Sequence, residues 1–171
     1  MEFNVLVETP RGSRNKYEMN HETGRLRLDR MLFTSTSYPC DYGYIPGTLA
    51  EDGDLLDALV LGGTPTFPGC EIHARAVAVF WMNDELGPDA KVLAVPANDP
   101  RYSDIQDLSD VPEHTRDEIW HFFDVYKDLE PQKSADARGW QDRVPAEEVL
   151  TAALARTAAE PTSGPDSAQL V

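Results

Sequence analysis

Residues 52–63 have the sequence DGDLLDALVLGG, in which an acidic run leads directly into a short apolar segment. The apolar segment, 58–61, is bounded by two glycines and is typical of a buried strand. Asp52, Asp54 and Asp57 stand at its entry, where carboxylates packed together would repel by roughly 4 kcal/mol per close pair at an effective dielectric near 20. A hard cation such as Mg²⁺ would offset that repulsion through oxygen ligands.

The acidic run by itself supports two interpretations equally well, a solvated turn and a metal site. In an extended segment Asp52 and Asp54 point the same way, because positions i and i+2 share a face. A calcium loop of the EF-hand type is excluded, since it requires glycine where the chain has Asp57 and glutamate where it has Gly63. Residues elsewhere in the chain are needed to distinguish the solvated turn from the metal site.

Short strands separated by turns are predicted over the first hundred residues. Residues 3–8 alternate apolar and polar side chains, which is typical of a half-buried strand. Segments 16–19 and 26–29 face each other across a turn in which Gly24 is free to adopt positive φ, and together they predict a hairpin. Further strands are predicted at 58–61, 72–82 and 91–95.

Two amphipathic helices are predicted after the strands. The first runs from Pro112 to about Asp128, with apolar side chains recurring at helical spacing, and the second covers 145–158. The tail at 159–171 is rich in proline, serine, glycine and alanine and is predicted to be disordered. Strands followed by helices favour an α+β protein with a β-barrel core.

Length, charge and cysteine content narrow the range of possible functions. The 171 residues correspond to about one domain, and the formal net charge of −15 argues against binding to DNA, RNA or anionic lipid. Cys40 and Cys70 lack metal-binding spacing and are interpreted as free structural thiols. No signal peptide and no apolar run of about 18 residues is present, so we expect a cytoplasmic protein.

Phenol and ammonium groups accompany the acids elsewhere in the chain. The segment 38–44 contains three tyrosines and is interpreted as an irregular loop, and Tyr126-Lys127 closes the first helix. Such groups donate hydrogen bonds to phosphate oxygens. The segment 84–91 adds Asp84, Asp89 and Lys91, although alone it is typical of a charged hairpin loop.

Taken in order, these blocks resemble the family I soluble inorganic pyrophosphatases of bacterial type. The blocks are Lys16-Tyr17-Glu18, Asp29-Arg30, 38–45, 52–57, 84–91 and 121–130. The resemblance implies an OB-like five-stranded β-barrel core flanked by two main C-terminal helices and extra hairpins, in a single catalytic domain at 1–158. It also implies Mg²⁺-dependent hydrolysis of inorganic diphosphate to two orthophosphates, in phosphate metabolism, by a homohexamer. Mn²⁺ and Zn²⁺ are implied as substitutes for Mg²⁺, and Ca²⁺ as an inhibitor.

The resemblance assigns roles position by position. The carboxylate that takes a proton from the attacking water is Asp54. The acids that match metal ligands are Asp52, Asp57, Asp84, Asp89, Glu8 and Glu18. The side chains that match contacts to phosphate are Lys16, Arg30, Tyr42, Lys91, Tyr126 and Lys127, while Tyr38 matches a tyrosine lining the cavity.

Two positions call for separate comment. The family usually has proline where this chain has Leu55, and proline would bias the preceding Asp54 toward extended dihedrals. We expect the substitution to loosen the loop modestly while keeping every ligand atom. His21 in the hairpin turn is interpreted as solvated, with contact to the active-site rim of a neighbour as the alternative.

Three rival interpretations remain at this point. OB-like barrels commonly bind oligonucleotides, but such a module should be basic and this chain is acidic. Another Mg²⁺-dependent phosphohydrolase acting on nucleotides is the second rival. An inactive relative is the third, and it is disfavoured because every expected ligand is present.

Overall fold

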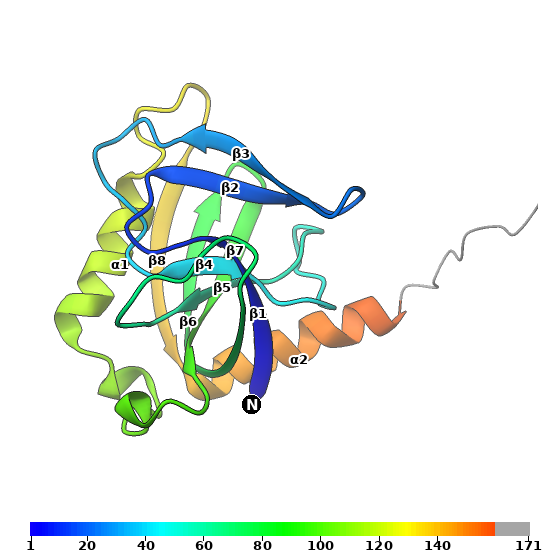
Figure 1. Ribbon diagram of the computed structural model, residues 1–171, viewed down its shortest axis with the longest axis vertical. Coiled ribbons are helices and arrows are strands. Elements are labelled where there is room, and N and C mark those ends of the chain that lie inside the picture. Colours follow the sequence, from blue (N-terminus) through cyan, green and yellow to red (C-terminus); the bar gives the residue numbers. More distant parts are fainter. Residues whose placement is uncertain (160–171) are drawn as a thin grey trace, which may run out of the picture.

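The computed structural model describes residues 1–159, and its centre is a six-stranded mixed sheet. Five of its strands close into a ring in the order β1-β4-β5-β7-β6, because β1 pairs with β6 as well as with β4 (Figure 1). All pairings in the ring are antiparallel except that between β5 and β7. The strands are β1 (Glu2–Thr9), β4 (Asp41–Tyr44), β5 (Asp57–Val60), β6 (Glu71–Asp84), β7 (Gly87–Pro96) and β8 (Ala135–Asp142). The ring confirms the predicted five-stranded barrel core.

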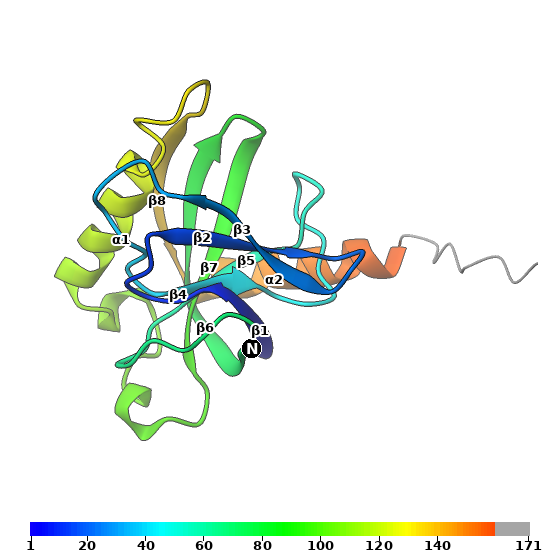
Figure 2. The same cartoon turned by 45° about the horizontal axis from the view of Figure 1, so that its top comes forward.

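The predicted hairpin forms a separate two-stranded sheet, β2 (Asn15–Asn20) with β3 (Arg25–Met31). Its turn contains Gly24 at φ 64°, the left-handed conformation that glycine adopts without steric cost. In Figures 1 and 2 the hairpin crosses above β4 and β5, on the side where the β6–β7 hairpin ends. The hairpin therefore covers one end of the ring.

Two helices pack on different sides of the sheet: α1 (Glu113–Val125) and α2 (Arg143–Ala159). Successive residues of a strand point to opposite faces, and the core divides accordingly. Leu59 and Leu93 belong to the cluster that includes Ile119, Phe122 and Phe123 of α1. Their neighbours Ala58, Val60, Val92 and Ala94 belong to the cluster that includes Ala146, Leu150 and Ala153 of α2.

Four features differ from the sequence expectations. The segment 38–44 is not an irregular loop throughout, because its second half forms β4 between β1 and β5. Strand β8 was not predicted, since its polar sequence and Gly139 hide the strand pattern that its pairing with β6 imposes. Two short 3₁₀ helices, η1 (Pro100–Tyr102) and η2 (Leu108–Asp110), were also missed.

The fourth difference concerns the helix bounds. The first helix ends at Val125, with turns continuing to the predicted end, and the second begins two residues before Pro145. The second helix also includes Ala159, the first residue of the predicted disordered tail, which is therefore one residue too long. The remainder of that tail, 160–171, lies outside the described residues.

The cysteines fit the structural role expected of them. Cys40 and Cys70 are both free, and burial raises the pKa of the Cys40 thiol to about 12. Within residues 1–159 no helix is long and apolar enough to cross a membrane.

A bulge and a glycine shape the pairing of β1 with β4. The register shifts between Val7 and Thr9, so that Glu8 is the extra residue of β1. Directly opposite, a Cβ atom on Gly43 would lie 2.0 Å from the Leu6 carbonyl oxygen. Only glycine allows the two backbones to approach this closely, and the segment that carries Glu8 and Tyr42 depends on it.

We expect Gly43→Ala to destabilise the fold by about 3 kcal/mol or more, because the methyl group overlaps backbone that cannot rotate away. Thermal or urea unfolding measures the change. Gly62→Ala is the matched control, since its Cβ would meet only the Thr64 carbonyl oxygen at 3.7 Å. Equal stability of the two variants would contradict the close approach.

Candidate active site

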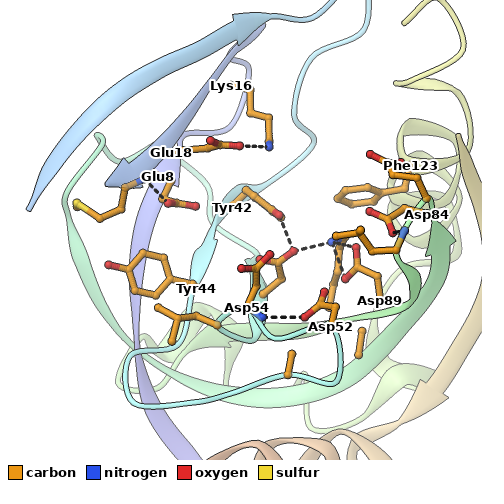
Figure 3. A pocket seen from close by; sticks show the side chains of 18 of the residues that line it. Glu8, Lys16, Glu18, Tyr42, Tyr44, Asp52, Asp54, Asp84, Asp89 and Phe123 are labelled. Carbon is orange, nitrogen blue, oxygen red and sulfur yellow. Dashed lines mark hydrogen bonds and ion pairs between the residues drawn. The ribbon is translucent and has the colours of Figure 1, made fainter. Parts of the chain in front are cut away.

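A cavity of about 650 Å³ opens between the end of the ring, the β2–β3 hairpin and the turn after α1. Figure 3 shows acidic and basic side chains from distant parts of the chain pointing into it. Every residue assigned a role from the sequence lines this cavity: Glu8, Lys16, Glu18, Arg30, Tyr38, Tyr42, Asp52, Asp54, Asp57, Asp84, Asp89, Lys91, Tyr126 and Lys127. Asp52 and Asp54 lie in an exposed turn, and together with Asp57 they also line this shared cavity.

Lys91 and Asp57 form the centre of the site. They are direct partners in the parallel pairing of β5 with β7, and the Lys91 Nζ atom lies 2.6 Å from Asp57 Oδ2. The same ammonium lies 2.8 Å from Asp89 Oδ2, and the Tyr42 hydroxyl donates to Asp57 Oδ2 at 2.5 Å. Burial opposes the charge of Lys91, whose side chain is 2% exposed, but the two carboxylates outweigh it and raise its pKa.

The loop before β5 presents Asp52 and Asp54 side by side. Gly53 between them has φ 92°, and the Asp54 amide donates to Asp52 Oδ1 at 3.0 Å. The Ala50 amide donates to the Asp54 carbonyl oxygen at 2.7 Å and closes the loop. This closed loop holds both carboxylates at the cavity, as Figure 3 shows.

Several carboxylates resist ionisation in this setting. Burial raises the pKa of Glu8 to about 7, opposed by the Met19 amide that donates to its Oε1 at 2.6 Å. Burial, opposed by Lys91 and reinforced by Asp57, raises the pKa of Asp89 to about 6. Burial and the nearby Asp52 raise the pKa of Asp54 as well. Each of these three carboxyl groups therefore keeps its proton to a higher pH than an isolated carboxyl group does.

The donor set fits a hard divalent cation, because every acidic side chain here offers carboxylate oxygens and the acidic side chains that line the cavity outnumber the lysines and the arginine. Among residues 1–159 no group of three acidic, imidazole or thiol side chains is already arranged to hold a metal ion. Lys91 instead occupies the space between Asp57 and Asp89. To bind a metal ion, Asp57 and Asp89 would therefore have to give up their hydrogen bonds to Lys91 or use their remaining oxygen lone pairs.

Basic side chains around the cavity pair with acidic ones. Lys16 donates to Glu18 Oε1 at 2.6 Å, and Lys127 donates to Asp84 at 3.2 Å and Glu85 at 3.0 Å. Arg30 Nε donates to Glu130 Oε1 at 2.8 Å. The wall behind them is aromatic: Tyr38, buried, packs against Phe122 with ring centroids 4.7 Å apart. Such a cavity, with charged groups on an apolar wall, suits a small and highly charged anion.

Sequence reasoning missed several neighbours of the site. Arg27 donates to Glu18 Oε2 at 2.8 Å, and together with Lys16 it outweighs the effect of partial burial and lowers the pKa of Glu18 to about 2. Glu85 and Glu130 belong to blocks that were identified, yet neither received a role. The sequence did offer a clue to both: Glu85 directly follows Asp84, a predicted metal ligand, and Glu130 comes three residues after Lys127, a predicted phosphate contact.

His21 and Leu55 both line the cavity of their own chain. His21 is exposed, as predicted, and its ring meets Tyr44 edge to face at 5.1 Å between centroids. Its proposed alternative, contact with a neighbouring chain's rim, stays a prediction. Leu55 is half-buried, directly after Asp54.

The chain is similar to known proteins in both sequence and structure. Residues 5–158 match the family model described as inorganic pyrophosphatase. The chain is 59% identical over 147 residues to the inorganic pyrophosphatase of Streptomyces coelicolor, covering 86% of this chain and 90% of that protein. It is 53% identical over 158 residues to that of Leifsonia xyli subsp. xyli, covering 92% and 97%. The crystal structure of inorganic pyrophosphatase from Thermus thermophilus superposes with a TM-score of 0.90 at 48% identity, covering 92% of this chain and 91% of that one.

The raised pKa of Glu8 predicts a pH-dependent stability of the metal-free protein. Between pH 4.5 and about 7 the folded state binds more protons at Glu8 than the unfolded state does, so stability falls as pH rises through that window. Glu8→Gln should remove about 2–3 kcal/mol of this fall while its side-chain oxygen still accepts from Met19. Urea unfolding in EDTA at pH 5 and pH 8 measures it. An identical pH dependence in both proteins would contradict the assignment.

Proposed function

This chain belongs to the inorganic pyrophosphatase family, and we propose that it hydrolyses diphosphate by a Mg²⁺-dependent attack of water in the cavity described above. Hydrolysis of inorganic diphosphate is the activity that its family and its close relatives share. The observation that carries the proposal is the alternation of carboxylates with ammonium, guanidinium and phenol groups around one cavity. Carboxylates suit the cations that such a reaction needs, and the cationic and phenolic donors suit phosphate oxygens.

The metal ions are assigned to the acidic half of the cavity. Asp52, Asp57 and Asp89 would form the tightest site, with Asp57 shared between two ions. Asp84 would hold an ion that arrives with diphosphate, while Glu8 and Glu18 would act largely through water. Bound cations would neutralise the charge of diphosphate and make a water molecule more acidic. We assign this role to Mg²⁺, with Mn²⁺ and Zn²⁺ as substitutes and Ca²⁺ as an inhibitor.

Asp54 is assigned as the general base. It lies on the closed loop beside Asp52, and burial together with Asp52 raises its pKa above that of an isolated aspartate. A base whose pKa is closer to the working pH accepts a proton more effectively. Direct attack by water needs no protein nucleophile, which agrees with a cavity in which Cys40 and Cys70 take no part.

The basic half of the cavity is assigned to the substrate. Lys16, Arg30 and Lys91 would hold the phosphate oxygens, and Tyr42 would donate its hydroxyl proton. Lys127 and Tyr126, in the turn after α1, would meet the charge that develops on the leaving phosphate. Tyr38 lines the apolar wall behind them.

The wider assignments follow the family resemblance. We propose a single catalytic domain at 1–158, a homohexamer, a cytoplasmic location and a role in phosphate metabolism. Sedimentation of the purified protein would test the assembly: six chains per particle are expected, and a stable monomer would contradict it.

Phosphate release from diphosphate, compared with release from ATP, tests the proposed function. With Mg²⁺ we expect rapid release from diphosphate and little from ATP, because the groups assigned to the substrate are ammonium, guanidinium and phenol donors, which suit phosphate oxygens rather than a base. EDTA should abolish the activity. Release from diphosphate that is unchanged in EDTA would contradict the metal assignment, and faster release from ATP would favour a nucleotide hydrolase.

Replacing the proposed base separates chemistry from binding. Asp54→Asn should lower the turnover number by about 10²–10⁴, because the amide cannot accept a proton, while diphosphate still binds. Calorimetric titration and initial rates measure the two properties. Near-normal turnover in this variant would remove Asp54 from its role.

A further inference from the structure

Glu130 is a buried carboxylate behind the wall of the cavity. Its side chain is 3% exposed, and it does not line the cavity itself. It accepts a hydrogen bond from Arg30 Nε at 2.8 Å, across 100 residues of sequence. Its other oxygen lies 3.9 Å from the ammonium of Lys133, an exposed residue that also lines the cavity. Arg30, whose side chain is 15% exposed, does line the cavity.

The backbone around Glu130 fixes the direction of its side chain. The Glu130 amide donates to the Lys127 carbonyl oxygen at 2.8 Å, which ties it to the turn after α1. Pro131 and Gln132 then form a tight turn that the Lys133 amide closes on the Glu130 carbonyl at 3.4 Å, with Gln132 at φ 62°. A non-glycine residue at positive φ costs about 1 kcal/mol or more and often lies near a functional site.

A hydrogen bond at Nε restricts the arginine more than a contact at the end of the guanidinium does. It fixes the plane of the group, while Asp29 binds Nη1 from the other side. Among the described residues Nη2 donates to no protein acceptor, and the Arg30 side chain lines the cavity. A guanidinium held in this way can meet a phosphate without first losing side-chain entropy.

We infer that Glu130 is a positioning residue, which holds Arg30 in the orientation that binds diphosphate. The inference rests on the proposed role of Arg30 in the reaction. Glu130 also lies in the same turn as Tyr126 and Lys127. It thereby links the arginine of β3 to Tyr126 and Lys127, the two groups assigned to the leaving phosphate.

The first test compares single variants by steady-state kinetics with saturating Mg²⁺. Glu130→Ala should lower kcat/KM by about 10- to 100-fold, because a freed arginine is misplaced by an ångström or more. Glu130→Gln keeps the accepting oxygen and should recover much of that loss. Glu118→Ala removes an exposed carboxylate from α1, 60% exposed, and should leave the kinetics unchanged. A loss in Glu130→Ala no larger than in this control would overturn the inference.

The second test asks whether Glu130 acts through Arg30. Arg30→Ala should itself lower kcat/KM by about 10²–10³-fold, as removal of one donor to developing charge does. In that background Glu130→Ala should cause no further loss, since its partner is already gone. A further loss as large as that in the wild-type background would overturn the inference. Near-normal activity of Arg30→Ala would instead contradict the proposed role of Arg30, so the two failures are distinguishable.

Thermal unfolding gives a readout for the same variants that does not depend on catalysis. Arg30→Ala leaves Glu130 buried without its main partner and should lower the melting temperature. The double variant Arg30→Ala/Glu130→Ala also removes the unpaired buried carboxylate, so its melting temperature should be higher than that of Arg30→Ala. This double variant and Glu130→Gln keep the test decisive even where Glu130→Ala folds poorly. No recovery in the double variant would overturn the pairing on which the inference depends.

Discussion

The buried ammonium of Lys91 between Asp57 and Asp89 is the interaction on which the rest of the site depends. A lysine with 2% of its side chain exposed is stable only beside compensating charge, and the two carboxylates supply it. In turn the lysine lets the two acids lie close together. The contact also requires the parallel register that sets Asp57 beside Lys91. A slip of either strand by one residue would put the two side chains on opposite faces of the sheet.

That register explains why the cavity lies on the side of the sheet that α1 covers. Asp57 and Lys91 share their face with Leu59 and Leu93, which pack in the same cluster as α1. The intervening Ala58 and Val92 point toward α2. One strand therefore contributes to two separate cores, and the α1 side places Tyr126 and Lys127 opposite the acids. The polar site therefore lies at the solvent-open end of the apolar cluster between the sheet and α1.

The sequence was sufficient for the parts of the fold that have a local signal. The period-2 pattern of β1, the hairpin around Gly24 and the apolar stripe of α1 all appear where they were predicted. The strand β8 could not be found in this way, because its pairing with β6 rather than its composition determines its conformation. The cavity residues were found because they occur in family order. The contact between Glu130 and Arg30 could be seen only in the structure, because the two residues are 100 positions apart in the sequence.

Leu55 shows how tertiary contacts can replace a local restraint. Proline at this position would stiffen Asp54 through its own ring. Here the loop is closed by hydrogen bonds from the Ala50 amide to Asp54 and from the Leu49 amide to the Ala153 carbonyl oxygen of α2. Arg156 of α2 adds a bond to the Leu49 carbonyl oxygen at 3.2 Å. The loosening expected from leucine is thus opposed by the end of a helix, so the order of the acid loop depends on the docking of α2 and not on Leu55 alone.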